Sequence, residues 1–210
     1  LGKLGGRSEG TPVGSHVAAG SAHAILATTC GKVFSWGSNE QGQLGIGGED
    51  ATAWVASPRR VDPLARAMIV HVAAGGEQSA ACAKDGAIFC WGFGGYSPRK
   101  IKLPRESAVG QCPHLRLAKP CGEQVACGVS HTAALTNDGR LYVWDASRSP
   151  RSVSLGGGER AISLSAARYS TVAVTAAGHV FTWEEHWHAG WHPPPSRVPE
   201  LAQASCAAAA

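Results

Sequence analysis

The chain has 210 residues and a mild net charge of +4, with 44% hydrophobic residues, only 16% charged residues and 27 glycines. This composition excludes an intrinsically disordered chain and favours many short strands joined by turns. No apolar run approaches the roughly 18 residues of a membrane-spanning helix, and no charged-then-apolar signal segment opens the sequence, so we expect no membrane partner.

One short pattern occurs four times along the chain. Each copy has a small apolar run, a turn glycine, and a tryptophan five residues after that glycine. The glycines and tryptophans are Gly31 and Trp36, Gly86 and Trp91, Gly139 and Trp144, and, in the weaker fourth copy, Gly178 and Trp183. Successive tryptophans are 55, 53 and 39 residues apart. Constant spacing inside each copy and variable spacing between copies predicts a repeated structural unit with loops of free length.

Each turn glycine lies between two β-prone runs. In the third copy, residues 134–144 read ALTNDGRLYVW, and Asp-Gly between such runs is the strongest short signal for a β-hairpin. The second copy repeats the Asp-Gly pair, whereas the first and fourth keep only the glycine. We therefore predict a hairpin in every copy, with its glycine at positive φ.

An aromatic residue stands two positions before each repeat tryptophan. These residues are Phe34, Phe89, Tyr142 and Phe181. Because side chains alternate across a strand, each pairs with its tryptophan on one face of the sheet. We predict an aromatic layer between neighbouring sheets, with all four repeat tryptophans in the core. Trp54, Trp187 and Trp191 are left outside this account.

A second phrase closes each unit. It reads Ser57-Pro-Arg-Arg-Val61, Ser97-Pro-Arg-Lys-Ile101 and Ser149-Pro-Arg-Ser-Val153, with a looser version at residues 195–198. Proline cannot donate to a sheet ladder, so we expect it at the first position of an edge strand. Each unit then has about four strands, which is typical of a β-propeller blade.

Two segments resemble the regulator of chromosome condensation family. Residues 125–144 (VACGVSHTAALTNDGRLYVW) resemble its repeat, and residues 36–47 (WGSNEQGQLGIG) resemble the segment that follows it. Copies two to four lack the Gly-Gln-Leu-Gly stretch. The resemblance implies an all-β fold, a seven-bladed propeller, of which this chain holds about four blades of four antiparallel strands.

The expected organisation is a single repeat domain over residues 1–210. We place the repeats at about 14–64, 70–104, 123–155 and 162–201, with 1–13 as the tail of a preceding repeat and 105–122 as an insertion. Four blades form an open arc with two uncovered sheet faces, so the arc should be marginally stable alone or should associate.

The seven cysteines include no Cys-x-x-Cys motif, and Cys82, Cys90 and Cys127 fall in strand positions. This favours reduced, buried thiols in an intracellular protein, cytoplasmic or nuclear. A disulfide between Cys112 and Cys121, inside the expected insertion, is the minority alternative.

Two groups of histidines require interpretation. His23 and His131 share one repeat position, which Gln78 and Ser170 occupy in the other copies, so we expect them to satisfy buried backbone groups rather than to catalyse. Residues 184–192 (EEHWHAGWH) place His186, His188 and His192 close together. An exposed loop is the favoured reading, and a zinc or copper site is the alternative.

The sequence contains no phosphate-binding loop, no Gly-x-Ser-x-Gly elbow and no evident activated nucleophile, so we expect no enzyme activity and no cofactor. Propellers bind partners through variable loops. The candidate partner-binding residues are Trp54, Arg99, Lys100, Lys102, Trp187 and Trp191, since tryptophan and arginine are enriched at interface hot spots. Their alternative roles are to cover apolar surface and to keep an edge strand soluble.

The resemblance implies two functions. The first is a non-catalytic scaffold that docks protein partners. The second is guanine-nucleotide exchange on a Ran-like small GTPase with chromatin association, although no wedge segment for exchange can be placed and no basic stripe argues for nucleic acid. Ultraviolet sensing, a third role in the family, needs a tryptophan just before the histidine position, and none of the four copies has one.

Overall fold

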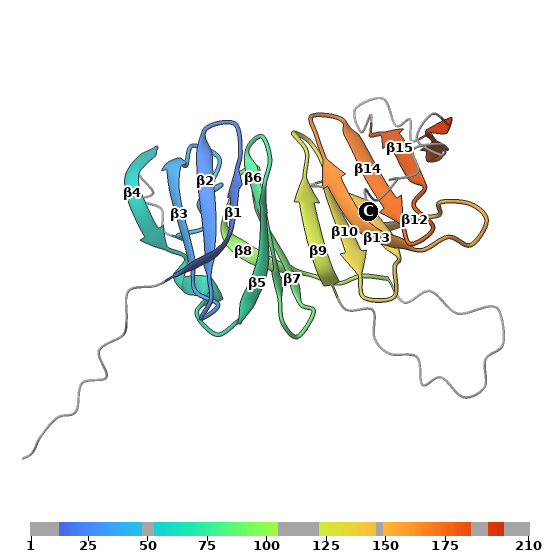
Figure 1. The fold of residues 1–210 in the computed structure, drawn as a ribbon. Helices are drawn as coiled ribbons and strands as arrows, with labels where there is room; N and C mark the ends of the chain where they lie inside the picture. The colour runs from blue at the N-terminus through green and yellow to red at the C-terminus, as the bar shows by residue number, and fades with distance from the viewer. Residues whose placement is uncertain (1–12, 48–52, 105–121, 146–148, 186–192, 200–210) are drawn as a thin grey trace, which may run out of the picture.

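The computed structural model describes residues 13–47, 53–104, 122–145, 149–185 and 193–199. Four antiparallel sheets of four strands each follow one another along the chain (Figure 1). Blade 1 holds β1 (Gly14–Ala19), β2 (His23–Thr28), β3 (Val33–Ser38) and β4 (Trp54–Arg60), followed by a 3-10 turn, η1 (Asp62–Leu64). Blade 2 holds β5 (Ile69–Ala74), β6 (Gln78–Ala83), β7 (Ile88–Gly92) and β8 (Gly95–Ile101). Blade 3 holds β9 (Gly122–Cys127), β10 (Thr132–Thr136), β11 (Leu141–Trp144) and β12 (Arg151–Val153). Blade 4 holds β13 (Ala161–Ala166), β14 (Ser170–Thr175), β15 (Val180–Glu184) and β16 (Ser196–Arg197). The prediction of an all-β propeller segment with four four-stranded blades is confirmed.

The turn glycines join the second and third strands of each blade. Their φ angles are +78° at Gly31, +76° at Gly86, +77° at Gly139 and +79° at Gly178, as the hairpin pattern predicts. A side chain with a Cβ is strained in this region, which explains why glycine alone is common to all four turns.

Each sheet packs face to face against the next, and the backbones approach most closely where the first two strands of one blade meet the first strand of the following blade. We call the contacts between successive blades the first, second and third seams. A separate apolar cluster fills each seam: Ile25 and Val33 meet Val72 and Trp91 in the first, and equivalent residues fill the other two. The core is therefore three thin layers between sheets and not one central mass (Figure 1).

The repeat tryptophans face the preceding blade. Trp91 packs against blade 1, Trp144 against blade 2 and Trp183 against blade 3, and each is at most 4% exposed. Trp36 differs from the prediction, because it is only half-buried, as is its partner Phe34. The same orientation points this pair away from blade 2, toward a side where the described residues supply no sheet.

The prolines lie on the outermost strands, but the prediction that they begin those strands is wrong for two of them. Pro58 lies inside β4 and Pro98 inside β8, whereas Pro150 just precedes β12. In both β4 and β8 the register with the neighbouring strand shifts beside the proline. A bulge on an edge strand needs no N–H from these residues, so proline is tolerated within the strand.

Glycines that directly follow the first strand of a blade let neighbouring blades approach backbone to backbone. A Cβ on Gly75 would lie 2.0 Å from the carbonyl oxygen of Gly128, and the amide of Gly76 donates to that same oxygen. Ser21 and Val129 make the matching bonds in the first and third seams, to the carbonyls of Gly75 and Arg168. Small residues at these strand ends thus set the spacing of the arc.

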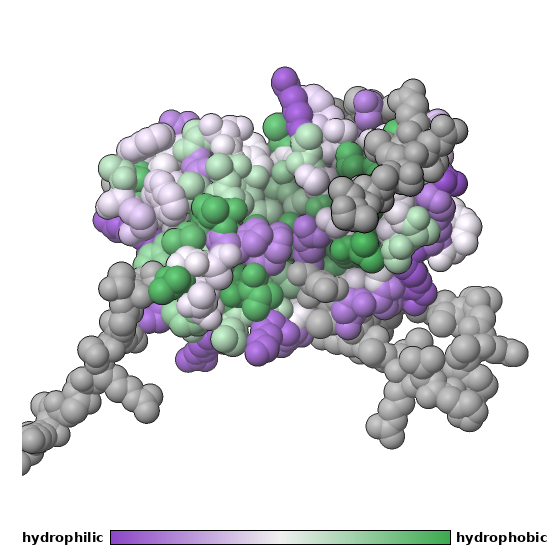
Figure 2. Space-filling model, in the orientation of Figure 1, coloured by the Kyte–Doolittle hydropathy of each residue, from purple (hydrophilic) through white to green (hydrophobic). Residues whose placement is uncertain are grey.

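The two end blades carry exposed apolar side chains. Val17 on β1 is 64% exposed, and Ile162, at the register shift of β13, is 61% exposed. Figure 2 shows hydrophobic residues on one face of the molecule in several separate patches with polar residues between them. In the described residues, no helix is long and apolar enough to cross a membrane.

Candidate functional site

The repeat position of the two histidines holds a hydrogen bond across each seam. His23 Nε2 lies 2.8 Å from Ser79 Oγ in the first seam, and His131 Nε2 lies 2.8 Å from Thr171 Oγ1 in the third. In the second seam Gln78 Nε2 donates to the carbonyls of Gly128 and His131, as expected for this position. Both histidines meet a hydroxyl of the next blade. His23 also has a hydrogen bond with the backbone of Gln78, as predicted, whereas the contact of His131 with Thr171 differs from the prediction.

Burial makes these histidines unsuited to catalysis. It lowers the pKa of His23 to about 4 and that of His131 to about 4, so both are neutral at physiological pH. Ser79, the hydroxyl beside His23, is 0% exposed and out of reach of a substrate. Ser79 and His23 resemble a nucleophile and its base, but their role is structural.

Residues 39–47, the described part of the connection between β3 and β4, pack into the first seam. Leu44 in this connection is 0% exposed. Ser35 Oγ donates to the Leu44 carbonyl at 2.7 Å, and Ser79 Oγ and Trp91 Nε1 both donate to the Gln43 carbonyl at 2.9 Å. Three donors from two blades thus hold the main chain of one loop segment.

The second seam has an open pocket at the corresponding place. Its volume is about 230 Å³, and its lining includes Cys90, Trp91, Arg99, Trp144 and Asp145. Burial raises the pKa of the Cys90 thiol to about 12, while hydrogen bonds with the side chains of Thr132 and Trp144 act in the opposite direction. The thiol is therefore protonated and is not an activated nucleophile. We call this cavity the second-seam pocket.

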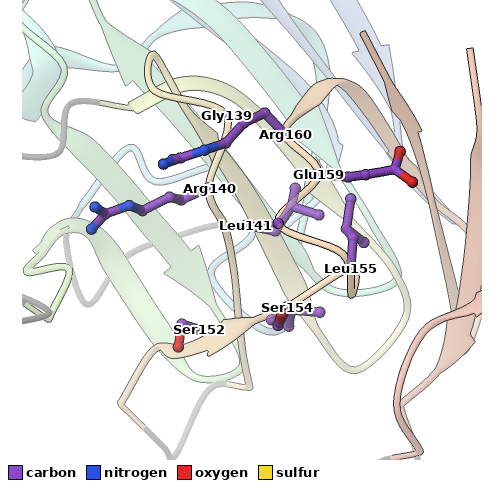
Figure 3. Close-up of a pocket in the computed structure, with 10 residues that line it drawn as sticks. Gly139, Arg140, Leu141, Ser152, Ser154, Leu155, Glu159 and Arg160 are labelled. Atoms are coloured by element: carbon purple, nitrogen blue, oxygen red, sulfur yellow. The ribbon is translucent and has the colours of Figure 1, made fainter. Parts of the chain in front are cut away.

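A further pocket of about 290 Å³ opens at the hairpin end of the third seam (Figure 3). Arg140 and Arg160 extend to one side of it, and the carboxylate of Glu159 points the opposite way. These charges already have partners. Glu159 accepts hydrogen bonds from Thr175 and lies 2.9 Å from His179 Nδ1, and these contacts lower the pKa of its carboxyl group.

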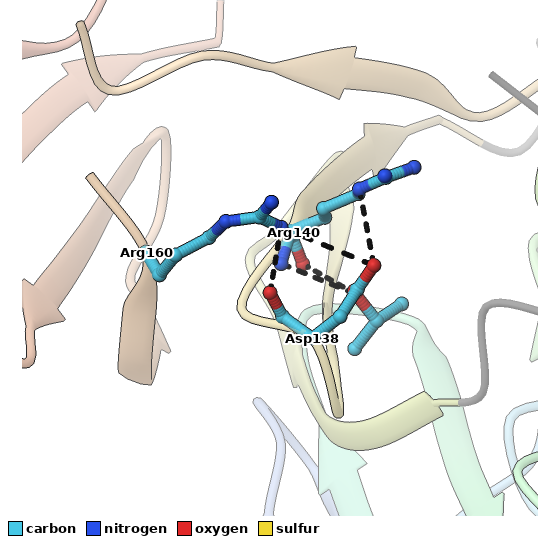
Figure 4. Close-up of polar contacts among 4 residues, drawn as sticks. Asp138, Arg140 and Arg160 are labelled. Carbon is cyan, nitrogen blue, oxygen red and sulfur yellow. Dashed lines mark hydrogen bonds and ion pairs between the residues drawn. The ribbon is translucent and has the colours of Figure 1, made fainter. Parts of the chain in front are cut away.

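Asp138 ties the two arginines of this pocket together (Figure 4). Its carboxylate lies 3.1 Å from Arg140 Nε, and Arg160 Nη1 donates to its main-chain carbonyl at 2.7 Å. This arrangement stabilises the hairpin tip and the chain entering β13, which makes a structural role the best account of the pocket.

A buried carboxylate lies in the third seam, beside the indole of Trp183. Glu185 is 0% exposed and accepts two hydrogen bonds from Arg151 Nη2, at 2.6 and 2.9 Å, and one from Trp183 Nε1 at 2.9 Å. Glu185 was not among the candidate residues predicted from the sequence. The signal was available in Glu184-Glu185 directly after the fourth tryptophan, but nothing in the sequence tells which of the two is buried.

The structure separates the candidate partner-binding residues. Trp54 begins β4 and is 62% exposed. The basic run lies on the edge strand β8 and just beyond it, but alternation divides it: Arg99 pairs with Cys90 and faces blade 3, whereas Lys100 pairs with Phe89 and faces blade 1. Lys102 is exposed after the end of β8. Trp187 and Trp191 lie outside the described residues.

Metal binding gains no support from the described part of the chain, where no three His, Cys, Asp or Glu side chains gather. His186, His188 and His192 lie outside it, as do Cys112 and Cys121. One histidine pair does meet across the first seam: the rings of His16 and His71 are 3.9 Å apart, and burial, with a smaller contribution from His16, lowers the pKa of His71 to about 4.

Comparison with known proteins agrees with this architecture. The model of the regulator of chromosome condensation (RCC1) repeat matches residues 30–82, and a second RCC1 repeat model matches residues 15–43 and 123–144. The first match runs from the turn of one blade's hairpin into the second strand of the next blade, so the sequence repeat is offset from the structural blade.

Curated relatives are much longer than this chain. The mouse E3 ubiquitin-protein ligase HERC2 is 31% identical over 190 residues, which cover 80% of this chain and 4% of HERC2. The ultraviolet-B receptor UVR8 of Arabidopsis thaliana is 34% identical over 132 residues, covering 61% of this chain and 28% of the receptor.

Two solved structures share the fold. Human WBSCR16 superposes with a TM-score of 0.70 at 23% identity, over 88% of this chain and 52% of that chain. Yeast RCC1 (Prp20), solved with Kap60, superposes with a TM-score of 0.61 at 19% identity, over 80% of this chain and 43% of that chain. With its repeat motifs, its four stacked blades and these matches, the chain belongs to the regulator of chromosome condensation repeat family.

Proposed function

We propose that this chain is a non-catalytic scaffold that docks a protein partner through its connections and outer strands. The observation that carries the proposal is Trp54, whose side chain is left 62% exposed on an outer strand. Indole rings bury large areas and dominate interface energetics, so an exposed tryptophan on a rigid strand is a suitable anchor for a partner.

The charge around Trp54 indicates the kind of surface that would meet it. Arg59 and Arg60 are exposed on the same strand, and the chain carries a net charge of +4. Arg60 is paired with Asp62, so Arg59 is the more available of these two arginines. A partner with an apolar pocket and an acidic rim fits this strand.

The wider family supports a recognition role. Segments similar to this chain occur in a ubiquitin ligase and in an ultraviolet-B receptor, whose names describe different activities. A fold shared by proteins with such different activities supplies a frame, and its function depends on the sites placed on it. Several polar side chains at the seams of this chain bond to one another, which supports a frame without chemistry of its own.

The test compares Trp54→Ala with Ile162→Ala, which removes another large side chain of similar exposure, 61%, from the opposite end of the arc. Proteins cross-linked to the chain in cells are quantified by mass spectrometry. We expect Trp54→Ala to lose a specific partner about tenfold or more, and Ile162→Ala to retain it, with equal melting temperatures. An unchanged partner set with Trp54→Ala would contradict the proposal.

Guanine-nucleotide exchange on a Ran-like GTPase is the second candidate, favoured by the fold shared with yeast RCC1. It is tested on the same protein by following release of a fluorescent nucleotide from the GTPase. Acceleration of release would replace the scaffold proposal. Chromatin or nucleic-acid binding is the weaker part of this candidate, because the arginines and lysines of β8 face opposite sides of the sheet.

A further inference from the structure

The first and second seams have side chains at corresponding repeat positions but do not share the loop that the first seam holds. By repeat position, Cys90 corresponds to Ser35 and Trp144 corresponds to Trp91. In the first seam these positions hold the carbonyls of Gln43 and Leu44. The loop that supplies those carbonyls runs over residues 39–53, between β3 and β4.

Blade 2 has no counterpart of that loop. Its strands β7 and β8 are joined by Phe93 and Gly94 alone, with Gly92 paired to Gly95. A two-residue turn cannot reach over the next blade. The place filled by Leu44 in the first seam is therefore the second-seam pocket, of about 230 Å³.

The second seam also lacks the side-chain acceptor that the indole has in the third seam. There, the residue two after the tryptophan, Glu185, accepts from the indole of Trp183. The residue two after Trp144 is Ala146, whose side chain has no acceptor. The indole of Trp144, which is 2% exposed, is instead bonded to the thiol of Cys90, a weak acceptor.

We propose that the second-seam pocket binds a short turn-forming segment of a partner protein, in which a glutamine and a leucine lie between two glycines, as in Gly42-Gln-Leu-Gly45 of this chain, where the amide of Gly45 donates to the carbonyl of Gly42. A main-chain carbonyl of that segment accepts from Trp144 Nε1, and its leucine fills the space that Leu44 occupies in the first seam. Arg99 and Asp145 line the same pocket, one of each charge, which suits a main chain without net charge. This inference rests on the proposed scaffold function and assigns it a binding site.

The probe is a synthetic peptide of the chain's own residues 39–47 (NEQGQLGIG), with a control peptide in which aspartate replaces its leucine. The readout is the indole N–H resonance of Trp144 in the full ¹⁵N-labelled chain, assigned with Trp144→Phe or, if that variant does not fold, from through-space contacts to Cys90. We expect a saturable downfield shift with the leucine peptide and no shift with the control, because a carbonyl is a stronger acceptor than a thiol.

A matched pair of variants locates the site. Ser97 lines the pocket and is exposed, so Ser97→Trp should block it and lower peptide affinity about tenfold or more. Ser57 has the same repeat position in blade 1, where the seam is already filled, so Ser57→Trp should leave the affinity unchanged. Equal melting temperatures of both variants exclude unfolding as the cause.

Three outcomes would overturn the inference: no saturable shift, equal binding of both peptides, or a shift of the Trp91 indole in place of Trp144. None of them touches the scaffold proposal, which depends on partner loss with Trp54→Ala. Conversely, peptide binding that Ser97→Trp abolishes would stand even if Trp54→Ala retained every partner.

Discussion

Replacing both seam histidines with glutamine should remove much of the acid sensitivity of this fold. Glutamine already occupies the same position in blade 2, where Gln78 bonds across the second seam and Thr132 Oγ1 donates to its side-chain oxygen at 2.9 Å. His23→Gln and His131→Gln can therefore keep a hydrogen bond to Ser79 and Thr171 without a group that titrates near neutrality.

The sign follows from the pKa difference between the two states. The ordinary histidine pKa is 6.5, and burial lowers it to about 4 at His23 and at His131 in the folded chain. As the pH falls, the unfolded chain binds these protons first. The contribution of these two histidines to the free energy of unfolding is therefore fully present above about pH 6.5. It is lost as the pH falls toward 4.

The size of the effect is large for a domain of marginal stability. Between pH 7.5 and pH 5, each histidine removes about 2 kcal/mol from the free energy of unfolding, so the pair removes about 4 kcal/mol. His71, whose pKa is also lowered to about 4, contributes in the same direction in both proteins. The double variant should thus lose about 4 kcal/mol less than the natural chain over this range.

Urea unfolding followed by circular dichroism at pH 7.5 and pH 5 measures the difference. Each single variant should recover about half of the effect, since the two sites lie in different seams and should add. An identical loss of stability in the natural chain and the double variant would refute the reasoning, because it would mean that neither histidine is held neutral by burial.

Two glycine predictions follow from contacts. Gly139→Val should destabilise the chain by about 1–3 kcal/mol more than Gly178→Val. Both positions have positive φ, but of the two only Gly139 has a neighbour in the way of a Cβ, which would lie 2.7 Å from Arg160 Cβ. Equal losses of stability in thermal or urea unfolding would contradict this. Gly75→Ala should destabilise by about 3 kcal/mol or more by forcing blades 2 and 3 apart, whereas Ala167→Gly, at the same repeat position in blade 4, should change stability by less than about 1 kcal/mol; a tolerated Gly75→Ala would show that the seam can widen freely.

Much of the fold could be predicted from local patterns. The turn glycines, the alternating aromatic pairs and the repeated Ser-Pro-Arg phrase lie within about one hairpin of each other, where backbone geometry is encoded by neighbouring residues. These patterns were sufficient for the number of blades and strands. The position of Pro58 inside its strand was missed, because a bulge depends on the register of the pairing.

The candidate site could be predicted only in part. The exposed Trp54 followed from its place outside the repeat pattern, and the missing Gly-Gln-Leu-Gly stretch after Trp91 was visible before the pocket was. The sequence did not show that the missing stretch would leave a pocket. The reason is that the loop after one tryptophan covers the tryptophan of the next blade, 55 residues away.

Repetition in the chain is thus enough to specify the blades, but their stacking decides which groups are buried and with whom. His23 meets a hydroxyl 56 residues further on, and His131 meets one 40 residues further on. Whether a seam is filled by a loop, by the carboxylate of Glu185 or by neither depends on loop length and on the next sheet. Those contacts join residues that no local pattern connects, so they exist only once the sheets have packed.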